Sequence, residues 1–175
     1  MDLNYAIVGD NIYKKYKGFT LDIPQLTIPQ GFATALIGEN GAGKTTLMNI
    51  LAGIRLDYKG ELRYFGAYSD KDRENKPEVK EQIGYTGPGS YYLPQWKIKQ
   101  VESVSELLFS NFHKERFEHW LNELSVGADS NYLGKKVNSL SDGNRMKLMI
   151  AGVLARDTKM LLMDEPASPL DPLMR

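Results

Sequence analysis

The spacing of apolar and polar residues predicts short strands and one helix in the first third of the chain. Runs rich in β-branched and aromatic residues alternate with turn residues, which indicates strands over 5–9, 19–23, 32–38 and 61–66. A helix is expected over 45–52, and Gly53 follows it in the position of a helix-ending glycine. A strand, a glycine-containing turn and a helix therefore follow one another.

The second half is mainly helical. From 100 to 126 apolar residues recur at helix spacing, and four of them are expected in the core: Phe117, Trp120, Leu121 and Leu124. Another helix begins at the polar turn over 141–144, where Ser141 has the position of an N-cap. Its predicted apolar face consists of Met146, Met149, Ile150, Val153 and Leu154. A buried strand over 160–163 then ends in two acidic residues.

Composition limits the possible functions. A length of 175 residues with 42% apolar and 25% charged residues indicates one soluble globular domain. The 22 basic and 22 acidic residues balance, so no nucleic-acid partner is expected. The absence of cysteine excludes disulfides and thiolate metal sites. No apolar run approaches the roughly 18 residues of a membrane span, so a membrane role must come through a partner.

The sequence "GENGAGKT" matches the phosphate-binding P-loop pattern. Its glycines allow backbone N–H groups to surround phosphate oxygens without an obstructing Cβ. Lys44 supplies a positive charge to the phosphates, and the helix that begins here directs its positive end at the same anion. The predicted nucleotide-binding residues of this loop are Gly38, Glu39, Asn40, Gly41, Ala42, Gly43, Lys44, Thr45 and Thr46.

The acidic pair after the 160–163 strand supplies the second half of the predicted site. The Thr45 hydroxyl and Asp164 are the expected ligands of Mg²⁺, as in P-loop NTPases. Glu165 could polarise an attacking water molecule. Glu165 and Lys44 are therefore the candidate catalytic residues, with ATP and Mg²⁺ as the expected cofactors.

Together these motifs resemble the ATP-binding subunits of ABC transporters, over about 11–175. Residues 38–46 resemble the family's Walker A motif, and 160–165 resemble Walker B with its catalytic glutamate. "LSDGN" resembles the signature LSGGQ, and "SPLD" resembles the D-loop. Tyr16 falls where the family has an aromatic residue that stacks on adenine.

The resemblance implies an α/β P-loop NTPase fold of the ABC type. It has a mostly parallel core sheet, an N-terminal antiparallel β subdomain and a small helical subdomain. The chain would be a single ABC ATPase domain, in which 1–86 form the β subdomain and P-loop core. Residues 87–138 would form the helical subdomain, and 139–175 would carry the signature helix, Walker B and the D-loop.

The resemblance also implies two kinds of partner. Two ATP-binding subunits would meet head to tail around ATP, and a transmembrane permease subunit would hold them at the cytoplasmic face of the membrane. The signature residues would bind the nucleotide held by the other subunit: Ser141, Asp142, Gly143 and Asn144. Ser168 and Asp171 of the D-loop would lie at the dimer interface.

Some positions depart from the family pattern. Asp142 replaces a glycine and Asn144 a glutamine, and Pro88 occupies the place of the glutamine that normally reaches Mg²⁺ or water. Gln95 is an alternative for that role. In the family, a core strand that ends in a switch histidine follows the D-loop. Residues 1–175 stop before that strand, so we expect them to be an incomplete cassette that binds nucleotide but does not complete cycles of hydrolysis.

Two other classes of function remain open at this stage. One is a soluble ABC-type ATPase clamp acting in translation or DNA repair. The balanced charge and the short helical segment over 87–138 argue against it. The other is a degenerate module that binds nucleotide without hydrolysis, which Pro88 and the missing histidine would explain.

Overall fold

The computed structural model describes residues 4–70, 76–89, 91–126 and 131–166. The chain forms two compact units, Met1–Ile83 and Gly84–Arg175. Within the described ranges no helix combines the length and the apolar character that a membrane span requires.

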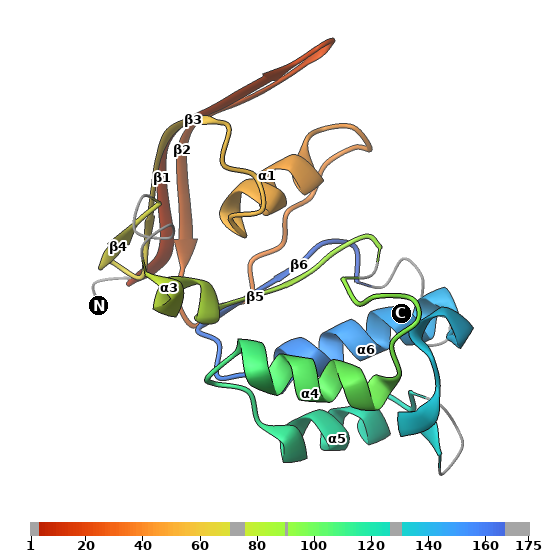
Figure 1. Cartoon of the computed structure of the whole chain (residues 1–175). Coiled ribbons are helices and arrows are strands. Elements are labelled where there is room, and N and C mark those ends of the chain that lie inside the picture. Colours follow the sequence, from red (N-terminus) through yellow and green to blue (C-terminus); the bar gives the residue numbers. More distant parts are fainter. Residues whose placement is uncertain (1–3, 71–75, 90, 127–130, 167–175) are drawn as a thin grey trace. The chain divides into compact units, whose positions relative to one another are not determined.

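The first unit contains a four-stranded antiparallel sheet in the order β2-β1-β3-β4 (Figure 1). The strands are β1 (Tyr5–Tyr16), β2 (Phe19–Pro29), β3 (Lys59–Tyr64) and β4 (Tyr68–Ser69). A tight turn joins β1 to β2, and Gly18 in that turn has a φ of +86°, which glycine adopts without strain. The strands predicted over 5–9, 19–23 and 61–66 are confirmed, and the first two are longer than expected.

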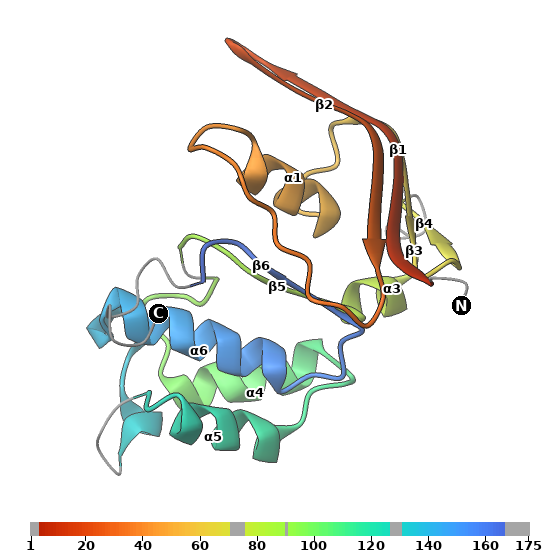
Figure 2. The same cartoon turned by 180° about the vertical axis from the view of Figure 1, so that it is seen from behind.

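Helix α1 (Lys44–Leu51) lies beside this sheet in both views (Figures 1 and 2), and the short helix α3 (Pro77–Glu81) ends the unit. The Tyr64 hydroxyl, on β3, donates a hydrogen bond of 3.2 Å to the Leu51 carbonyl at the end of α1. Gly53 follows the helix with a φ of +73°, as expected of a helix-ending glycine. Buried apolar side chains come from the sheet and the helix: Ile7, Ile12, Leu47, Ile50, Leu51 and Leu62.

The strand predicted over 32–38 is wrong. These residues have no strand structure, and their side chains are exposed, including Ile37 at 90% of its surface. The apolar pattern is that of a buried strand, but a strand also needs a neighbour for its backbone N–H and C=O groups. No strand among the described residues pairs with this segment.

The second unit combines a strand pair with helices. Strands β5 (Ile83–Thr86) and β6 (Met160–Met163) pair with each other. The Asp164 amide, just after β6, donates to the carbonyl of Thr86 at the end of β5. A Cβ at Gly84 would lie 2.8 Å from Leu161, so position 84 lies beside 161 and position 86 beside 164; both numbers increase together, and the strands therefore run in the same direction. This pair is the part of the expected parallel core sheet that the described residues contain.

Three helices form the rest of this unit and lie side by side in both views (Figure 2): α4 (Ile98–Leu108), α5 (Lys114–Glu123) and α6 (Asp142–Leu154). The short 3₁₀ turns η1 (Tyr132–Gly134) and η2 (Val137–Ser139) connect α5 to α6. The predicted stripe on α5 is confirmed, because Phe117 and Leu121 are buried and Trp120 and Leu124 pack against the same core.

The buried surface of α6 is wider than the predicted face. Met146, Met149 and Val153 are buried as expected, whereas Ile150 and Leu154 are only half-buried. Leu148, outside the predicted face, is completely buried in the core that α4 and α5 share. A helix covered on several sides does not have one apolar stripe, so its periodicity underestimates its buried surface.

Candidate functional site

The glycine-containing loop before α1 is closed around its own lysine. The Lys44 ammonium group donates hydrogen bonds of 2.7 Å to the Gly38 carbonyl and 2.8 Å to the Glu39 carbonyl. The Ala42 amide also donates to the Glu39 carbonyl, at 3.2 Å. The positive charge of Lys44 is therefore held at the mouth of a loop whose backbone is exposed.

The start of α1 is suited to an anion. Gly43 precedes the helix with a φ of +93°, and no side chain caps the helix there. The first-turn N–H groups are therefore left to other acceptors. The exposed hydroxyl of Thr45 and the half-buried side chain of Thr46 follow in the same turn. Backbone N–H groups and the helix dipole favour a phosphate at this position.

An aromatic pair lies next to this loop in the first unit. Tyr16 and Phe19 are paired across the β1–β2 turn, and their rings are stacked with centroids 6.1 Å apart. A Cβ at Gly43 would lie only 2.6 Å from the Phe19 ring, so the phosphate loop contacts this pair directly. Phe19 was not among the predicted site residues, and its place directly across the turn from Tyr16 was the signal for it.

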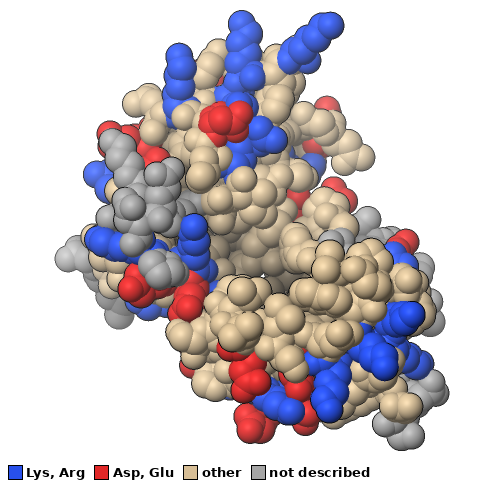
Figure 3. All heavy atoms as spheres, viewed as in Figure 1, with Lys and Arg blue, Asp and Glu red and all other residues tan. Residues whose placement is uncertain are grey.

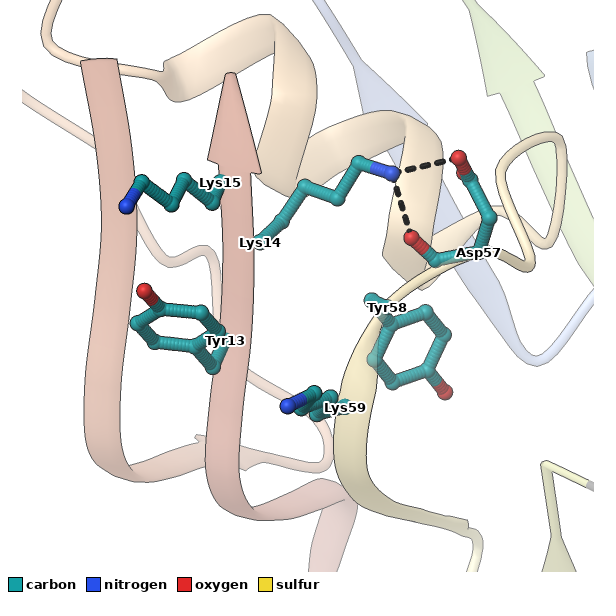
Figure 4. A pocket seen from close by; sticks show the side chains of 6 residues that line it. All are labelled: Tyr13, Lys14, Lys15, Asp57, Tyr58 and Lys59. Atoms are coloured by element: carbon teal, nitrogen blue, oxygen red, sulfur yellow. Dashed lines mark hydrogen bonds and ion pairs between the residues drawn. The ribbon is translucent and has the colours of Figure 1, made fainter. Parts of the chain in front are cut away.

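Two cations lie over the Tyr16 ring, and one carboxylate forms an ion pair with each of them. Lys14 and Arg55 each lie 5.5 Å from the centroid of this ring. Both are paired with Asp57, and the hydrogen bond from Lys14 is the main cause that holds the pKa of this carboxyl below its usual value. Lys14 and Asp57 also line a surface hollow of about 420 Å³ (Figure 4). Lysine and arginine side chains gather at the turn end of this hairpin (Figure 3).

The acidic pair lies at the carboxyl ends of β5 and β6. The Asp164 amide donates to the Thr86 carbonyl at 2.8 Å, and both side chains are buried. Asp164 Oδ2 and Thr86 Oγ1 have no hydrogen-bond partner among the residues that the structure describes. Across those residues, no three histidine, aspartate or glutamate side chains gather as a preformed metal site. An ion bound by Asp164 would therefore need other ligands, such as water or phosphate oxygens.

Glu165 is exposed and has an unusual backbone conformation. Its φ is +50°, in the left-handed region that residues other than glycine rarely adopt. Such strain is found most often at functional positions, where the surrounding structure imposes it. The conformation distinguishes Glu165 from its neighbour Asp164, which is buried.

Two tyrosine side chains are packed together at the carboxyl end of β5. The rings of Tyr85 and Tyr91 have centroids 5.9 Å apart, and their hydroxyls are hydrogen-bonded to each other. Burial, followed by the negative charge of Asp164, raises the pKa of Tyr85, and burial is also the main cause that raises the pKa of Tyr91. Both hydroxyls therefore remain protonated at neutral pH. Pro88, between them in sequence, is exposed.

The start of α6 agrees with its predicted cap. The Ser141 hydroxyl accepts a hydrogen bond of 3.3 Å from the Asn144 amide, so Ser141 is the N-cap. The Asp142 carboxylate pairs with Arg145 of the same helix at 2.9 Å. This ion pair offsets the negative charge that Asp142 brings to the signature, next to the half-buried Gly143.

The predicted residues thus fall into groups. The loop 38–46 and Tyr16 lie together in the first unit, and Asp164 and Glu165 lie together in the second. The signature residues 141–144 begin α6 in the second unit. Ser168 and Asp171 of the expected D-loop lie outside the described residues.

Comparisons with known proteins agree with the fold and the motifs. The family model described as ABC transporter matches residues 21–168. The tungstate uptake system ATP-binding protein TupC of Peptoclostridium acidaminophilum is 34% identical over 169 residues, which cover 95% of this chain and 74% of that protein. The thiamine import ATP-binding protein ThiQ of Haemophilus influenzae is 29% identical, over 86% of this chain and 68% of that protein.

Solved structures have the same fold. An ABC transporter ATP-binding protein from Pyrococcus furiosus has a TM-score of 0.75 at 22% identity, with 95% of this chain and 78% of that chain covered. The ATP-binding cassette MJ0796, solved as a dimer with ADP and Pi, has a TM-score of 0.73 at 20% identity, over 95% of this chain and 77% of that chain.

The fold is therefore that of a P-loop ATPase cassette. The chain belongs to the ABC transporter family and is an ATP-binding subunit, with ATPase activity, of a membrane transporter. The resemblance found in the sequence is confirmed, and the comparisons favour transport over the soluble clamp.

The contact between Gly43 and Phe19 gives a first prediction. Gly43→Ala should weaken ATP binding at least tenfold, because the new methyl group would push the start of the phosphate loop away from Phe19. Gly31→Ala is the matched control: Gly31 also has a positive φ, of +81°, but no atom lies within 4 Å of its Cβ position. Isothermal titration calorimetry with ATP compares the two. Equal losses of affinity would contradict the role of the Phe19 contact.

Proposed function

We propose that the residues of loop 38–46 bind the phosphates of ATP and that Glu165 activates the water molecule that attacks the γ-phosphate. The observation that carries this proposal is the closed loop around Lys44, whose ammonium group is held by two loop carbonyls at the start of α1. A phosphate can replace those carbonyls and gain charge-assisted hydrogen bonds. The strained backbone of the exposed Glu165 supports its role as the base.

Mg²⁺ is the metal that fits the remaining groups. Thr45 and Asp164 would hold it, and the buried Oδ2 of Asp164, which no described residue pairs with, supports this assignment. Mg²⁺ keeps several water ligands and is usually bound by one or two carboxylates together with phosphates, so a preformed cluster is not required. When bound, the ion neutralises charge on the transferred phosphoryl group.

The proposed working unit is a head-to-tail pair of ATP-binding subunits. In it the residues 141–144 of one subunit would complete the nucleotide site of the other, and Ser168 and Asp171 would lie at the interface. The start of α6 supports this role, because Ser141 caps the helix while its hydroxyl stays exposed. The dimeric form of MJ0796 supports the pairing.

A transmembrane permease is the proposed second partner, with the ATP-binding subunits on the cytoplasmic face of the membrane. The names of the relatives support this proposal, since they describe uptake and import systems. The transported substrate would be recognised by other subunits of such a system.

Lys44→Ala should abolish tight Mg-ATP binding, because it removes the only side-chain cation within loop 38–46. Each lost charge-assisted hydrogen bond costs about 1.5–3 kcal/mol, so affinity should fall at least tenfold. Calorimetry with Mg-ATP measures this change. Lys99→Ala, on the exposed side of α4, is the control and should bind as wild type does. Affinity of Lys44→Ala within twofold of wild type would rule out the assignment of this loop.

Tyr16→Ala should weaken ATP binding by about 1–3 kcal/mol, the contribution of one base-stacking contact. Triphosphate binding should be nearly unchanged, since inorganic triphosphate has no base to stack. Competition titrations with a fluorescent nucleotide measure both ligands. If both lost affinity equally, Tyr16 would have a structural role only.

Glu165→Gln should keep nucleotide binding and lower turnover, because the amide has the shape of the carboxylate without its negative charge. The loss expected for a general base is about 10²–10⁴-fold. In a chain that carries the complete domain, phosphate release measures turnover, and light scattering with saturating Mg-ATP should detect the dimer. Glu61→Gln, an exposed position on β3, is the control. A Glu165→Gln variant that stayed monomeric under these conditions would contradict the head-to-tail pair.

A further inference from the structure

A group of hydroxyls surrounds the carboxyl end of β5 in the second unit. Tyr85 and Thr86 end this strand, and Tyr91 lies five residues further along the chain. The Tyr91 hydroxyl is hydrogen-bonded to the Tyr85 hydroxyl and to the backbone of Gly87. The Tyr85 hydroxyl lies against Gly87, directly after Thr86, whose carbonyl accepts the 2.8 Å hydrogen bond from the Asp164 amide, so the pair lies at the strand end where Asp164 is bound.

The geometry of the loop holds the pair in place. A Cβ at Gly87 would lie 2.3 Å from the Tyr85 hydroxyl, so only glycine allows the phenol to fold back over the loop. The two rings also pack against each other, with centroids 5.9 Å apart. Tyr85 is thus oriented by Gly87 on one side and by Tyr91 on the other.

The same region contains two buried oxygens with unused hydrogen-bonding capacity. Asp164 Oδ2 and Thr86 Oγ1 have no partner among the described residues, although Thr86 is completely buried and Asp164 is 4% exposed. Buried polar atoms are usually satisfied by protein or by bound water. A buried carboxylate oxygen and a buried hydroxyl, both with unused capacity at one strand end, match the needs of a hydrated cation, whose water ligands donate hydrogen bonds.

We propose that Tyr85 and Tyr91, with Thr86, position the water ligands of the metal ion that Asp164 holds. This inference rests on the proposed function, in which Asp164 is a ligand of Mg²⁺. Mg²⁺ loses its water ligands reluctantly and usually keeps several of them when a protein binds it. These water molecules donate hydrogen bonds, so the protein can hold them through acceptor groups. A phenol hydroxyl can donate one hydrogen bond and accept another, so Tyr85 can be bonded to Tyr91 and to a water molecule at the same time.

The hydroxyls supply what Pro88 lacks. Pro88 is exposed and its side chain has no hydrogen-bonding group, whereas Tyr85 and Tyr91 flank it in sequence and are packed together at the end of β5, with the Tyr85 hydroxyl against Gly87. The tyrosines act here as positioning residues, because they would contact the water ligands rather than the reacting atoms. Partners of this kind typically change metal affinity 10–100-fold.

The test separates metal binding from nucleotide binding. Tyr91→Phe and Tyr85→Phe are prepared, and each keeps the ring while removing the hydroxyl. Mn²⁺ binding in the presence of a non-hydrolysable ATP analogue is followed by electron paramagnetic resonance, and binding of the analogue is measured in EDTA. We expect Mn²⁺ affinity about tenfold below wild type in both variants and unchanged metal-free binding of the analogue. Tyr132→Phe, in η1, is the matched control and should have wild-type Mn²⁺ affinity.

A rescue variant excludes a structural explanation. Pro88→Gln combined with Tyr91→Phe returns a hydrogen-bonding side chain to the loop and should recover most of the lost Mn²⁺ affinity. Wild-type Mn²⁺ affinity in both single variants would overturn the inference while leaving the proposed function intact. Equal losses with and without metal would also overturn it. If the unaltered chain showed no metal-dependent nucleotide binding, the proposed function would fail, and the inference with it.

Discussion

The hydrogen bond from the Asp164 amide to the Thr86 carbonyl determines where the two acidic side chains of the second unit lie. This 2.8 Å bond joins the carboxyl ends of β5 and β6, at the point where the two segments leave the strands. It fixes Asp164 in a buried position and leaves Glu165, one residue later, exposed. Two adjacent carboxylates therefore have different surroundings, and different surroundings are what separate a metal ligand from a base.

This arrangement has a cost in stability that the packing of the helices offsets. A positive φ at Glu165, and buried oxygens of Asp164 and Thr86 that no described residue pairs with, are features that each cost about 1–3 kcal/mol when nothing compensates them. The core beneath them is continuous: α4, α5 and α6 bury Val101, Phe117 and Leu148 completely. A rigid scaffold with strain and unused polar atoms at one end of its strands is typical of a site that is completed by its ligand.

Sequence patterns predicted the features that depend on neighbouring residues. The Ser141 cap, the helix end at Gly53 and the stripe with Phe117 follow from local backbone geometry and helical spacing, and all are present. The prediction of a strand over 32–38 was wrong because a strand forms only where a segment distant in sequence supplies hydrogen bonds to its backbone. The contact of Phe19 with the phosphate loop depends on the register of the β1–β2 hairpin. In the sequence, the turn between the two strands is the only local indication of that register.

The cation of the proposed phosphate loop, and the arginine that follows the signature residues, both have partners within the chain. Lys44 is bonded to two loop carbonyls, and Arg145 is paired with Asp142 at the start of the signature helix. A phosphate gains the attraction of these cations only by replacing their present partners, so the net gain is a difference between two sets of hydrogen bonds. For Lys44 the exchange is from neutral carbonyls to a charged phosphate, which favours the ligand. Arg145 is already paired with an anion, so this pair would keep the start of α6 close to neutral in the proposed head-to-tail dimer until the nucleotide of the other subunit arrived.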